Sequence, residues 1–447
     1  TYFGAQNVTA AKVTLVNRVT QIYEDETAIR LVLINDTAKT NLNTPALASE
    51  PNGPCGAAPC YTPAQLSTCG GGTLNRNIIA LGQLVGASSY DVGHIGLGVN
   101  GGGVAGLGVV GGASKARGCT GLPTPVGDFF AVDYVAHEIG HQFAGNHTFN
   151  GTQLNCSGGN RSAANSYEPG SGSSIMAYAG ICRQDDLQPH SDPYWSHRSY
   201  TEITTFVNSA RPLINEVQNV SLREFDTDGD GFSLMFGGQL SAPIVRGTNY
   251  TTAGIKAAIE AIPRWPAGAT VTVAGFGGAV TLDDTGFQVT FNGGPVAATN
   301  LDSLGIADPT GASGFVGETV KGGAQDNGGT RVDDTGNHAP VVSLPAASYT
   351  IPVRTPFALT GSAADTDGDH LTYLWEQNDR GGTTGTALTS NTKVNGPLFR
   401  QFGTAAIVSP TDTLRYYSPG ENAVNDDPTR VFPDLKQIAA NNTNAST

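Results

Sequence analysis

The chain has 447 residues, of which 38 are acidic and 24 are basic, so its formal net charge is −14. Such an acidic surface repels phosphate backbones and anionic lipids, so we expect neither nucleic acid nor an anionic membrane as a partner. No apolar run approaches the roughly 20 residues that cross a bilayer, and we expect no transmembrane segment. The length suits two to four domains.

The first half of the chain alternates between helical and extended patterns. In chain order we predict a helix over 8–23, a buried strand over 28–34, a helix over 73–85 capped by Thr73, a strand over 91–99, a strand-and-turn region over 101–112, and helices over 127–142 and 199–208. This alternation favours an α/β layer, which we assign to a first domain over residues 1–212.

After residue 212 the pattern changes twice. Alternating strands and an amphipathic helix over 251–262 predict a small α+β module over 222–335, which ends in a Gly/Asp/Thr-rich linker. From 338 to 447, short strands between turns predict an all-β, immunoglobulin-like domain, and its polar tail suggests that the domain is incomplete. Its expected strands are 340–344, 348–352, 357–361 and 371–376.

All six cysteines lie in the first 182 residues, and none has CxxC spacing. An even number confined to one region favours disulfides made in an oxidising compartment over reduced cysteines in the cytosol. Six cysteines allow 15 pairings, and our first guess joins neighbours: Cys55–Cys60, Cys69–Cys119 and Cys156–Cys182. We therefore expect a secreted, extracellular protein, made as a precursor with a signal peptide and a propeptide.

Residues 137–147 read HEIGHQFAGNH and carry the chemistry of the chain. His137 and His141 lie one helical turn apart, so both imidazoles can reach one ion, and Glu138 lies about 100° further round the helix. His147 can join them only if the helix ends and the chain turns back. Gly145 offers that end, because glycine tolerates the left-handed conformation that often closes a helix.

Three histidine ligands leave a fourth position for water, whose pKa zinc lowers to about 7. Glu138 can accept the proton of that water, which then attacks a peptide carbonyl. An extended peptide would lie along the strand near Gly101–Val110. Two other interpretations are a helix with structural histidines and a closed structural zinc site, which normally has a fourth protein ligand.

The segment His137–His147 resembles the metzincin zinc motif, and SSIMAY at 173–178 resembles the metzincin Met-turn. The stretch 126–205 is similar to bacterial reprolysin-like (adamalysin-type) metallopeptidases, and a weaker similarity covers residues 1–212. The resemblance implies a twisted mixed sheet with helices above a zinc cleft, and an irregular lower subdomain after His147. It also implies that Met176 forms an apolar floor under the zinc ligands without binding the metal.

Two positions bear on how far the resemblance reaches. The metzincin pattern has glycine three residues after the second histidine, where this chain has Ala144, so the turn either contains a strained alanine or moves to Gly145. Tyr178 follows Met176 by two residues. In astacins and serralysins a tyrosine there donates a hydrogen bond to the oxyanion, whereas reprolysins proper do not use one.

Alternating aspartates in glycine turns form two weaker signals for structural calcium. They are Asp226, Asp228 and Asp230 in DTDGDG, and Asp365, Asp367 and Asp369 in DTDGD. The alternative is a solvated acidic turn at a domain boundary.

These patterns together predict a secreted zinc endopeptidase with one catalytic zinc, structural calcium, and protein or peptide substrates. By resemblance, the β modules after the protease domain bind substrate or the cell surface. Two alternatives stay open. One is a binding or adhesion protein with a decayed protease domain, and the other is a zinc hydrolase that acts on a substrate other than protein.

Overall fold

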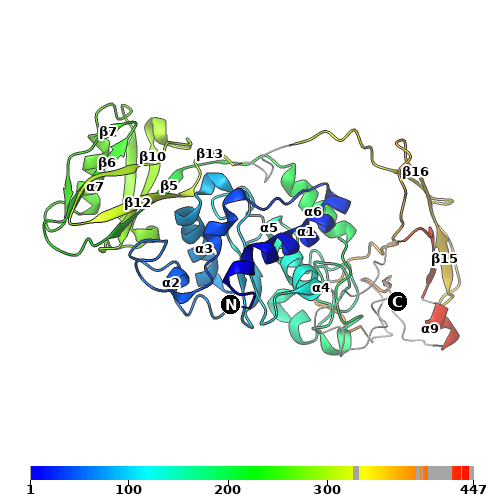
Figure 1. Cartoon of the computed structure of the whole chain (residues 1–447). Coiled ribbons are helices and arrows are strands. Elements are labelled where there is room, and N and C mark those ends of the chain that lie inside the picture. Colours follow the sequence, from blue (N-terminus) through cyan, green and yellow to red (C-terminus); the bar gives the residue numbers. More distant parts are fainter. Residues whose placement is uncertain are drawn as a thin grey trace.

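The computed structural model describes residues 2–325, 332–388, 393, 396–400, 425–433 and 435–441. Three groups of elements follow one another along an elongated molecule (Figure 1). A β-rich group lies at one end, the group that contains α1, α3 and α5 lies in the middle, and the described residues between 338 and 441 lie at the other end.

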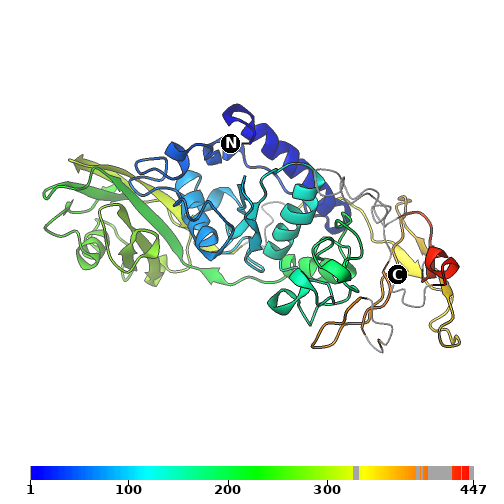
Figure 2. The same ribbon diagram turned by 90° about the horizontal axis from the view of Figure 1, so that it is seen from below.

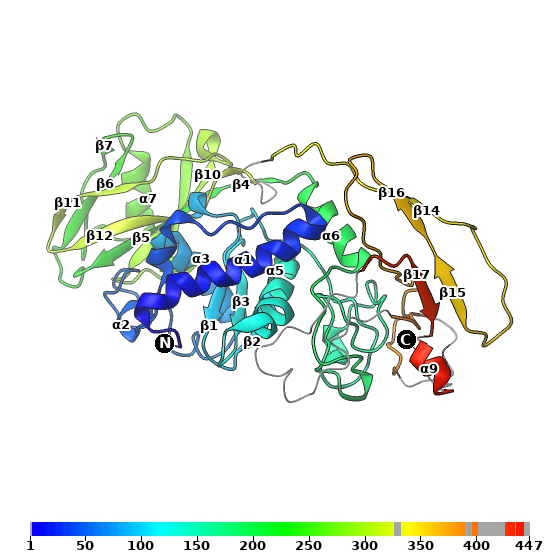
Figure 3. The ribbon, with the colours of Figure 1, turned by 45° about the vertical axis from the view of Figure 1, so that its right-hand side comes forward.

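The middle group is built on a three-stranded mixed sheet with the order β1-β3-β2. β1 (Ile95–Leu97) is parallel to β3 (Gly118–Gly121), and β2 (Gly102–Ala105) is antiparallel to β3 and forms an edge. The long helix α1 (Val8–Thr27) passes in front of this sheet in Figure 3, and also in front of the helix that follows the sheet in sequence. α3 (Gly71–Leu84) lies toward the β-rich end. The mixed helix and sheet layer that the sequence predicts is therefore present.

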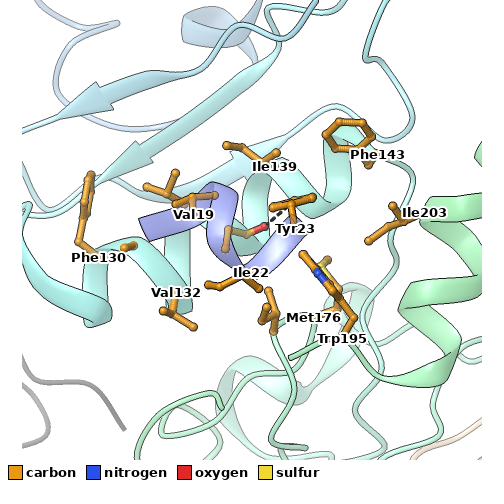
Figure 4. Packing of buried hydrophobic residues seen from close by; sticks show 14 of the residues in the cluster. Val19, Ile22, Tyr23, Phe130, Val132, Ile139, Phe143, Met176, Trp195 and Ile203 are labelled. Atoms are coloured by element: carbon orange, nitrogen blue, oxygen red, sulfur yellow. Dashed lines mark hydrogen bonds between the residues drawn. The ribbon is translucent and has the colours of Figure 1, made fainter. Parts of the chain in front are cut away.

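The central helix is continuous but not uniform. It runs through α4 (Gly127–Phe130), the π-helical segment η4 (Ala131–Ala136) and α5 (His137–Gln142). Its apolar side packs against α1, Met176, Trp195 and α6 (His197–Val207) in the main core (Figure 4). The buried hydroxyl of Tyr23 donates to the Ala136 carbonyl at 3.1 Å, which fixes α1 to the start of α5.

The buried strand predicted over 28–34 is wrong. Ala28 ends α1 in a left-handed conformation, and the chain then returns beside the helix without pairing with a strand. The Thr20 hydroxyl accepts the Leu31 N–H at 2.8 Å, and Lys12 Nζ donates to Thr40 Oγ1 at 2.7 Å. Within this branched segment, the Thr20 side chain of α1 thus provides a hydrogen bond that a β partner would otherwise supply.

Two further predictions near α3 need correction. Thr73 is not the N-cap, because α3 begins at Gly71 after Gly70, and the Thr73 hydroxyl instead donates to the Gln65 carbonyl at 2.8 Å. The strand predicted over 91–99 shortens to the three residues of β1.

The β-rich group has two sheets and its own core. One sheet has the antiparallel order β12-β5-β10-β9, made of Ser313–Val320, Glu216–Arg223, Gly286–Gly293 and Thr270–Gly275. The other contains β11 (Gly305–Thr310), β6 (Gly231–Phe236), β7 (Gln239–Leu240) and β8 (Ile244–Val245). The helix predicted over 251–262 is α7 (Thr252–Glu260), and the Thr251 side chain caps it.

The predicted linker begins with paired residues, because β13 (Gly323–Ala324) pairs with β4 (Leu213–Ile214). Beyond it, β14 (Val341–Ser343) pairs with β16 (Ser362–Ala364), and β15 (Phe357–Thr360) pairs with β17 (Thr429–Phe432), before the short helix α9 (Leu435–Ala439).

These two pairs of strands are too few for a sandwich. The described residues therefore do not confirm the predicted immunoglobulin-like domain. Residues 348–352 form no strand. In 371–376 only Tyr373 forms a bridge, with Asn425. Residues 401–424, where further strands would be needed, lie outside the described part.

All six cysteines are paired, as Cys55–Cys60, Cys69–Cys119 and Cys156–Cys182. Of the 15 connectivities that the sequence allows, this is the pairing of neighbours. Among the helices of the described residues, none has the length and apolar character needed to cross a bilayer.

Candidate metal centre

Three histidines on and after α5 turn their Nε2 atoms toward one point. The Nε2 atom of His147 lies 3.2 Å from that of His137 and 3.0 Å from that of His141. Two nitrogen ligands of a tetrahedral zinc, each 2.0–2.1 Å from the metal, would lie about 3.3 Å apart. The separations therefore suit the edges of a zinc coordination shell, and these residues form a group that can hold a metal ion.

The opposite ring nitrogens fix the tautomer of each imidazole. The Nδ1 atom of His137 lies 2.6 Å from the Ile175 carbonyl, that of His141 lies 2.7 Å from the Gly145 carbonyl, and that of His147 contacts the Asn160 carbonyl. A carbonyl can only accept, so each Nδ1 carries the proton and each Nε2 presents a lone pair.

Burial also keeps the three rings neutral. Desolvation lowers the pKa of His141 to about 4 and that of His147 to about 3, and it holds the pKa of His137 well below its usual value. Neutral lone pairs that face one another at this distance repel unless a cation lies between them. The donor set therefore fits Zn²⁺, which binds neutral imidazole.

The turn that brings His147 back is centred on Ala144 and not on Gly145. Ala144 has a φ of +72°, whereas Gly145 is not left-handed. The Ala144 N–H donates to the His141 carbonyl and the Gly145 N–H to the Gly140 carbonyl, each at 2.8 Å. These two bonds form a Schellman motif with alanine at the left-handed position. The expectation that Gly145 supplies the left-handed residue is therefore wrong.

Gly145 still matters for its small size. A Cβ at this position would lie 3.0 Å from the Gly140 carbonyl oxygen and 3.5 Å from Met176 Cγ.

Glu138 lies beside the three imidazoles in a dry environment. Its side chain is buried, and its Oε2 has no hydrogen-bond partner among the described residues. Burial raises the pKa of this carboxyl group to about 8, and a nearby cation would lower it. The edge strand β2 passes directly against the carboxylate, since a Cβ on Gly103 would lie 2.1 Å from Glu138 Oε1.

Met176 and Tyr178 both lie against the segment that carries the three histidines. Met176 is fully buried, and a Cβ on Gly140, between the first two histidines, would lie 2.5 Å from its sulfur. The Tyr178 ring centroid lies 4.5 Å from that of His147 and 5.6 Å from that of His137. Both side chains therefore contact the metal-binding segment, and the tyrosine reaches the histidine rings.

Of the two aspartate clusters, the C-terminal one converges. The carboxylate oxygens of Asp365, Asp367 and Asp369 lie within 4.8 Å of one another. The same cluster also accepts N–H donors, because the His338 N–H points at Asp367 Oδ2 at 2.7 Å.

The first aspartate cluster is not brought together as a metal-binding group in the described part of the chain. Asp230 Oδ2 accepts the N–H groups of Asp226 and Thr227, and Asp228 forms an ion pair with Arg246. Its carboxylates stabilise a turn and a surface contact.

Sequence reasoning missed the groups that orient the imidazoles. The carbonyls of Ile175 and Asn160 leave no side-chain signature. Glu168 and Arg400, which meet behind the Met176 turn, lie 232 residues apart and show no spacing pattern. Only the fold reveals that they form a pair.

A three-histidine centre with a glutamate after the first histidine, beside a mixed sheet, defines a metallopeptidase type of site. The family model described as metallo-peptidase family M12B, reprolysin-like, matches residues 5–197. Residues 5–197 are therefore similar to the reprolysin-like metallopeptidases, as the resemblance implies. No curated protein matches the chain.

Proposed function

We propose that the protein is a secreted endopeptidase that holds one catalytic zinc with His137, His141 and His147. The observation that carries the proposal is the convergence of three neutral imidazoles beside a buried carboxylate with a free oxygen. When bound, zinc would lower the pKa of a water molecule and polarise a peptide carbonyl. An intact Glu138 favours an active enzyme over a decayed protease domain.

Glu138 is proposed as the general base. Its unpaired Oε2 can accept a proton from water and then pass it to the departing amine nitrogen. The carboxylate must be ionised to start the reaction. A divalent cation nearby provides for this by lowering a pKa that burial alone raises to about 8.

Tyr178 is proposed to donate its phenolic hydrogen to the oxygen on which negative charge develops. Its ring lies beside His147, and burial raises its pKa, so the phenol keeps its proton at neutral pH.

The proposed substrate is an extended peptide that pairs with β2. This strand is the edge of the three-stranded sheet and touches Glu138 at Gly103. Main-chain hydrogen bonds to such an edge hold a peptide with little regard to its side chains. That mode of binding favours protein substrates over a small amide.

Secretion is proposed on the three disulfides, which persist in oxidising compartments. Structural calcium is proposed only at Asp365, Asp367 and Asp369, where the carboxylates converge. We expect millimolar CaCl2 to raise the melting temperature of the wild type, and Asp367→Asn to abolish that rise. An equal rise in both proteins would count against this site.

The proposed reaction is tested by cleavage of casein by the wild type and by Glu138→Ala, with and without 1,10-phenanthroline, with zinc measured by mass spectrometry. We expect about one zinc per chain in both proteins, and cleavage only by the untreated wild type. Exposed Glu50 provides the matched control, because Glu50→Ala should cleave like the wild type. Bound zinc without cleavage of any protein tried would refute the endopeptidase and favour a binding role.

A further inference from the structure

Residues 5–197, which match the metallopeptidase model, are called the metallopeptidase region below. Arg400 lies far from this region in sequence, but its side chain is buried against it. Its side chain is 3% exposed, and it forms ion pairs with Glu168 at 2.7 Å and with Glu376 at 2.6 Å. Its Nε donates to Ser173 Oγ at 2.9 Å, and Nη2, the nitrogen that pairs with Glu168, also contacts the Tyr194 hydroxyl. One guanidinium group thus contacts four side chains.

Glu168 connects this arginine to the turn that contains Met176. Its fully buried carboxylate accepts the N–H groups of Ser173 and Ser174, each at 3.0 Å, and the Ser174 hydroxyl at 2.5 Å. The same carboxylate accepts the Thr148 hydroxyl. One charged group therefore fixes both the start of the turn and the residue after His147.

The bonds of Ser174 and Thr148 lie one residue away from groups that orient or form the metal site. Ser174 precedes Ile175, whose carbonyl accepts the Nδ1 proton of His137. Thr148 follows His147, and its N–H donates to the Met176 carbonyl at 3.2 Å. A shift of the Glu168 carboxylate would move the carbonyl that orients one histidine and the backbone that carries another.

The segment that ends in Arg400 is attached to the lower subdomain at other points. The Gly381 N–H donates to the Ser166 carbonyl at 2.8 Å, and the Thr386 N–H donates to the Asn150 carbonyl at 2.9 Å. Arg161 Nη2 donates to the Gly382 carbonyl at 2.8 Å. In Figure 2 this orange-brown segment lies beside the green irregular part of the metallopeptidase region. These hydrogen bonds attach the segment at several points and thereby hold Arg400 in a fixed position.

We propose that Arg400 is a positioning residue of the metal centre, and that the metallopeptidase region becomes competent only when residues 376–388 and 396–400 dock and Arg400 neutralises Glu168. The proposal rests on the zinc site proposed above. Without the guanidinium, Glu168 would be a buried carboxylate without a counter-ion, which a protein does not tolerate in place. The carboxylate would turn toward water, and this movement would release the Met176 turn.

The test compares full-length Arg400→Met, Arg400→Lys, Glu168→Gln/Arg400→Met and a control, Arg380→Met, which removes an exposed arginine of the same segment. Two measurements do not require catalysis. They are the rate of zinc release to a chromogenic chelator and the visible spectrum of the cobalt-substituted protein, which reports ligand geometry. Circular dichroism checks that each variant is folded.

We expect Arg400→Met to release zinc at least tenfold faster than the wild type and to alter the cobalt spectrum. Arg400→Lys should lie between the two, and Arg380→Met should match the wild type. The double variant should release zinc more slowly than Arg400→Met, because position 168 no longer carries an unpaired charge. A folded Arg400→Met with wild-type zinc release and spectrum would overturn the proposal. If that variant does not fold, the lysine and double variants decide, and wild-type behaviour in both would overturn it equally.

The readouts separate the two proposals. A wild type that binds zinc without cleaving protein would refute the endopeptidase and leave this test intact. A zinc-loaded, cleaving wild type whose zinc release is insensitive to Arg400 would refute only the positioning role.

Discussion

Ala144 holds the backbone conformation in which a Cβ is least favourable, at the point where the chain turns to present His147. Left-handed alanine costs about 1 kcal/mol relative to glycine. We expect Ala144→Gly to raise the free energy of unfolding by up to about 1 kcal/mol in urea titration. Ala10→Gly, on the exposed part of α1, is the control and should lower it by about 1 kcal/mol. If Ala144→Gly lowers the stability like the control, the turn is not strained.

Gly103 is the second residue whose size bears on the reaction. A Cβ there would lie 2.1 Å from Glu138 Oε1, so Gly103→Ala must displace the carboxylate or the edge strand. We expect kcat/KM for casein peptides to fall at least tenfold, about 1.4 kcal/mol, while the zinc content stays at the wild-type level. Gly96→Ala in β1, where a Cβ would meet open space, should keep full activity. Unchanged activity in Gly103→Ala would mean that this carboxylate is free to move.

The grouping of His137, His141 and Glu138 could be predicted from the sequence because their spacing along one helix already places them on adjoining faces. The position of the turn could not, because glycine at 145 looked like the better left-handed residue. The structure shows that a Cβ at 145 would approach the Gly140 carbonyl, so Gly145 is the close-packed residue and Ala144 has the strained backbone.

At the scale of elements, helices with a strong apolar period were predictable and isolated extended runs were not. The helix predicted over 8–23 is α1, and the helix that carries the histidines is present with a π-helical segment that no periodicity reveals. The run at 28–34 has the composition of a strand, but a strand needs a partner. The Thr20 side chain of α1 provides another hydrogen bond for that run.

The backbone of α3 lies in close contact with the backbone of β12 in the β-rich group. A Cβ on Gly82 would lie 2.7 Å from Thr319 Cα, and one on Gly317 would lie 2.6 Å from the Gly82 carbonyl oxygen. We expect Gly82→Val to separate α3 from β12 and to split one thermal transition into two by calorimetry. Gly72→Ala in the same helix, where a Cβ meets open space, should keep a single transition. A single transition in Gly82→Val would show that this contact does not couple the two parts.

At the scale of the whole molecule, the sequence predicted domains in series, whereas the described residues show the C-terminal part attached to the side of the metallopeptidase region through Arg400 and residues 381–388. Long-range contacts of this kind leave no local pattern, because each partner looks like an ordinary surface residue in its own segment. The same interface contains a further carboxyl group, that of the half-buried Glu26 of α1, which lines a pocket of about 560 Å³ together with Glu376.

Glu26 should make stability depend on pH. Burial raises its pKa to about 8, and the Trp195 N–H opposes this only in part. The folded state therefore keeps a proton that the unfolded state releases above its ordinary pKa of 4.5, so this contribution to stability is lost as the pH rises from about 4.5 to 8. We expect Glu26→Gln to raise the melting temperature more at pH 8 than at pH 4.5. Glu50→Gln should leave the melting temperature unchanged at both pH values. An equal gain at both pH values would mean that Glu26 is ionised in the fold.

The disulfide Cys156–Cys182 closes a loop whose ends lie 26 residues apart, and this loop contains both Asn160 and Ile175. The carbonyls of these two residues orient two of the three histidines. We therefore expect formation of this disulfide to slow the release of the metal ion. We expect Cys156→Ser/Cys182→Ser to release zinc several-fold faster, and Cys55→Ser/Cys60→Ser to match the wild type. Such coupling would let the chain hold its metal firmly only after this disulfide has formed.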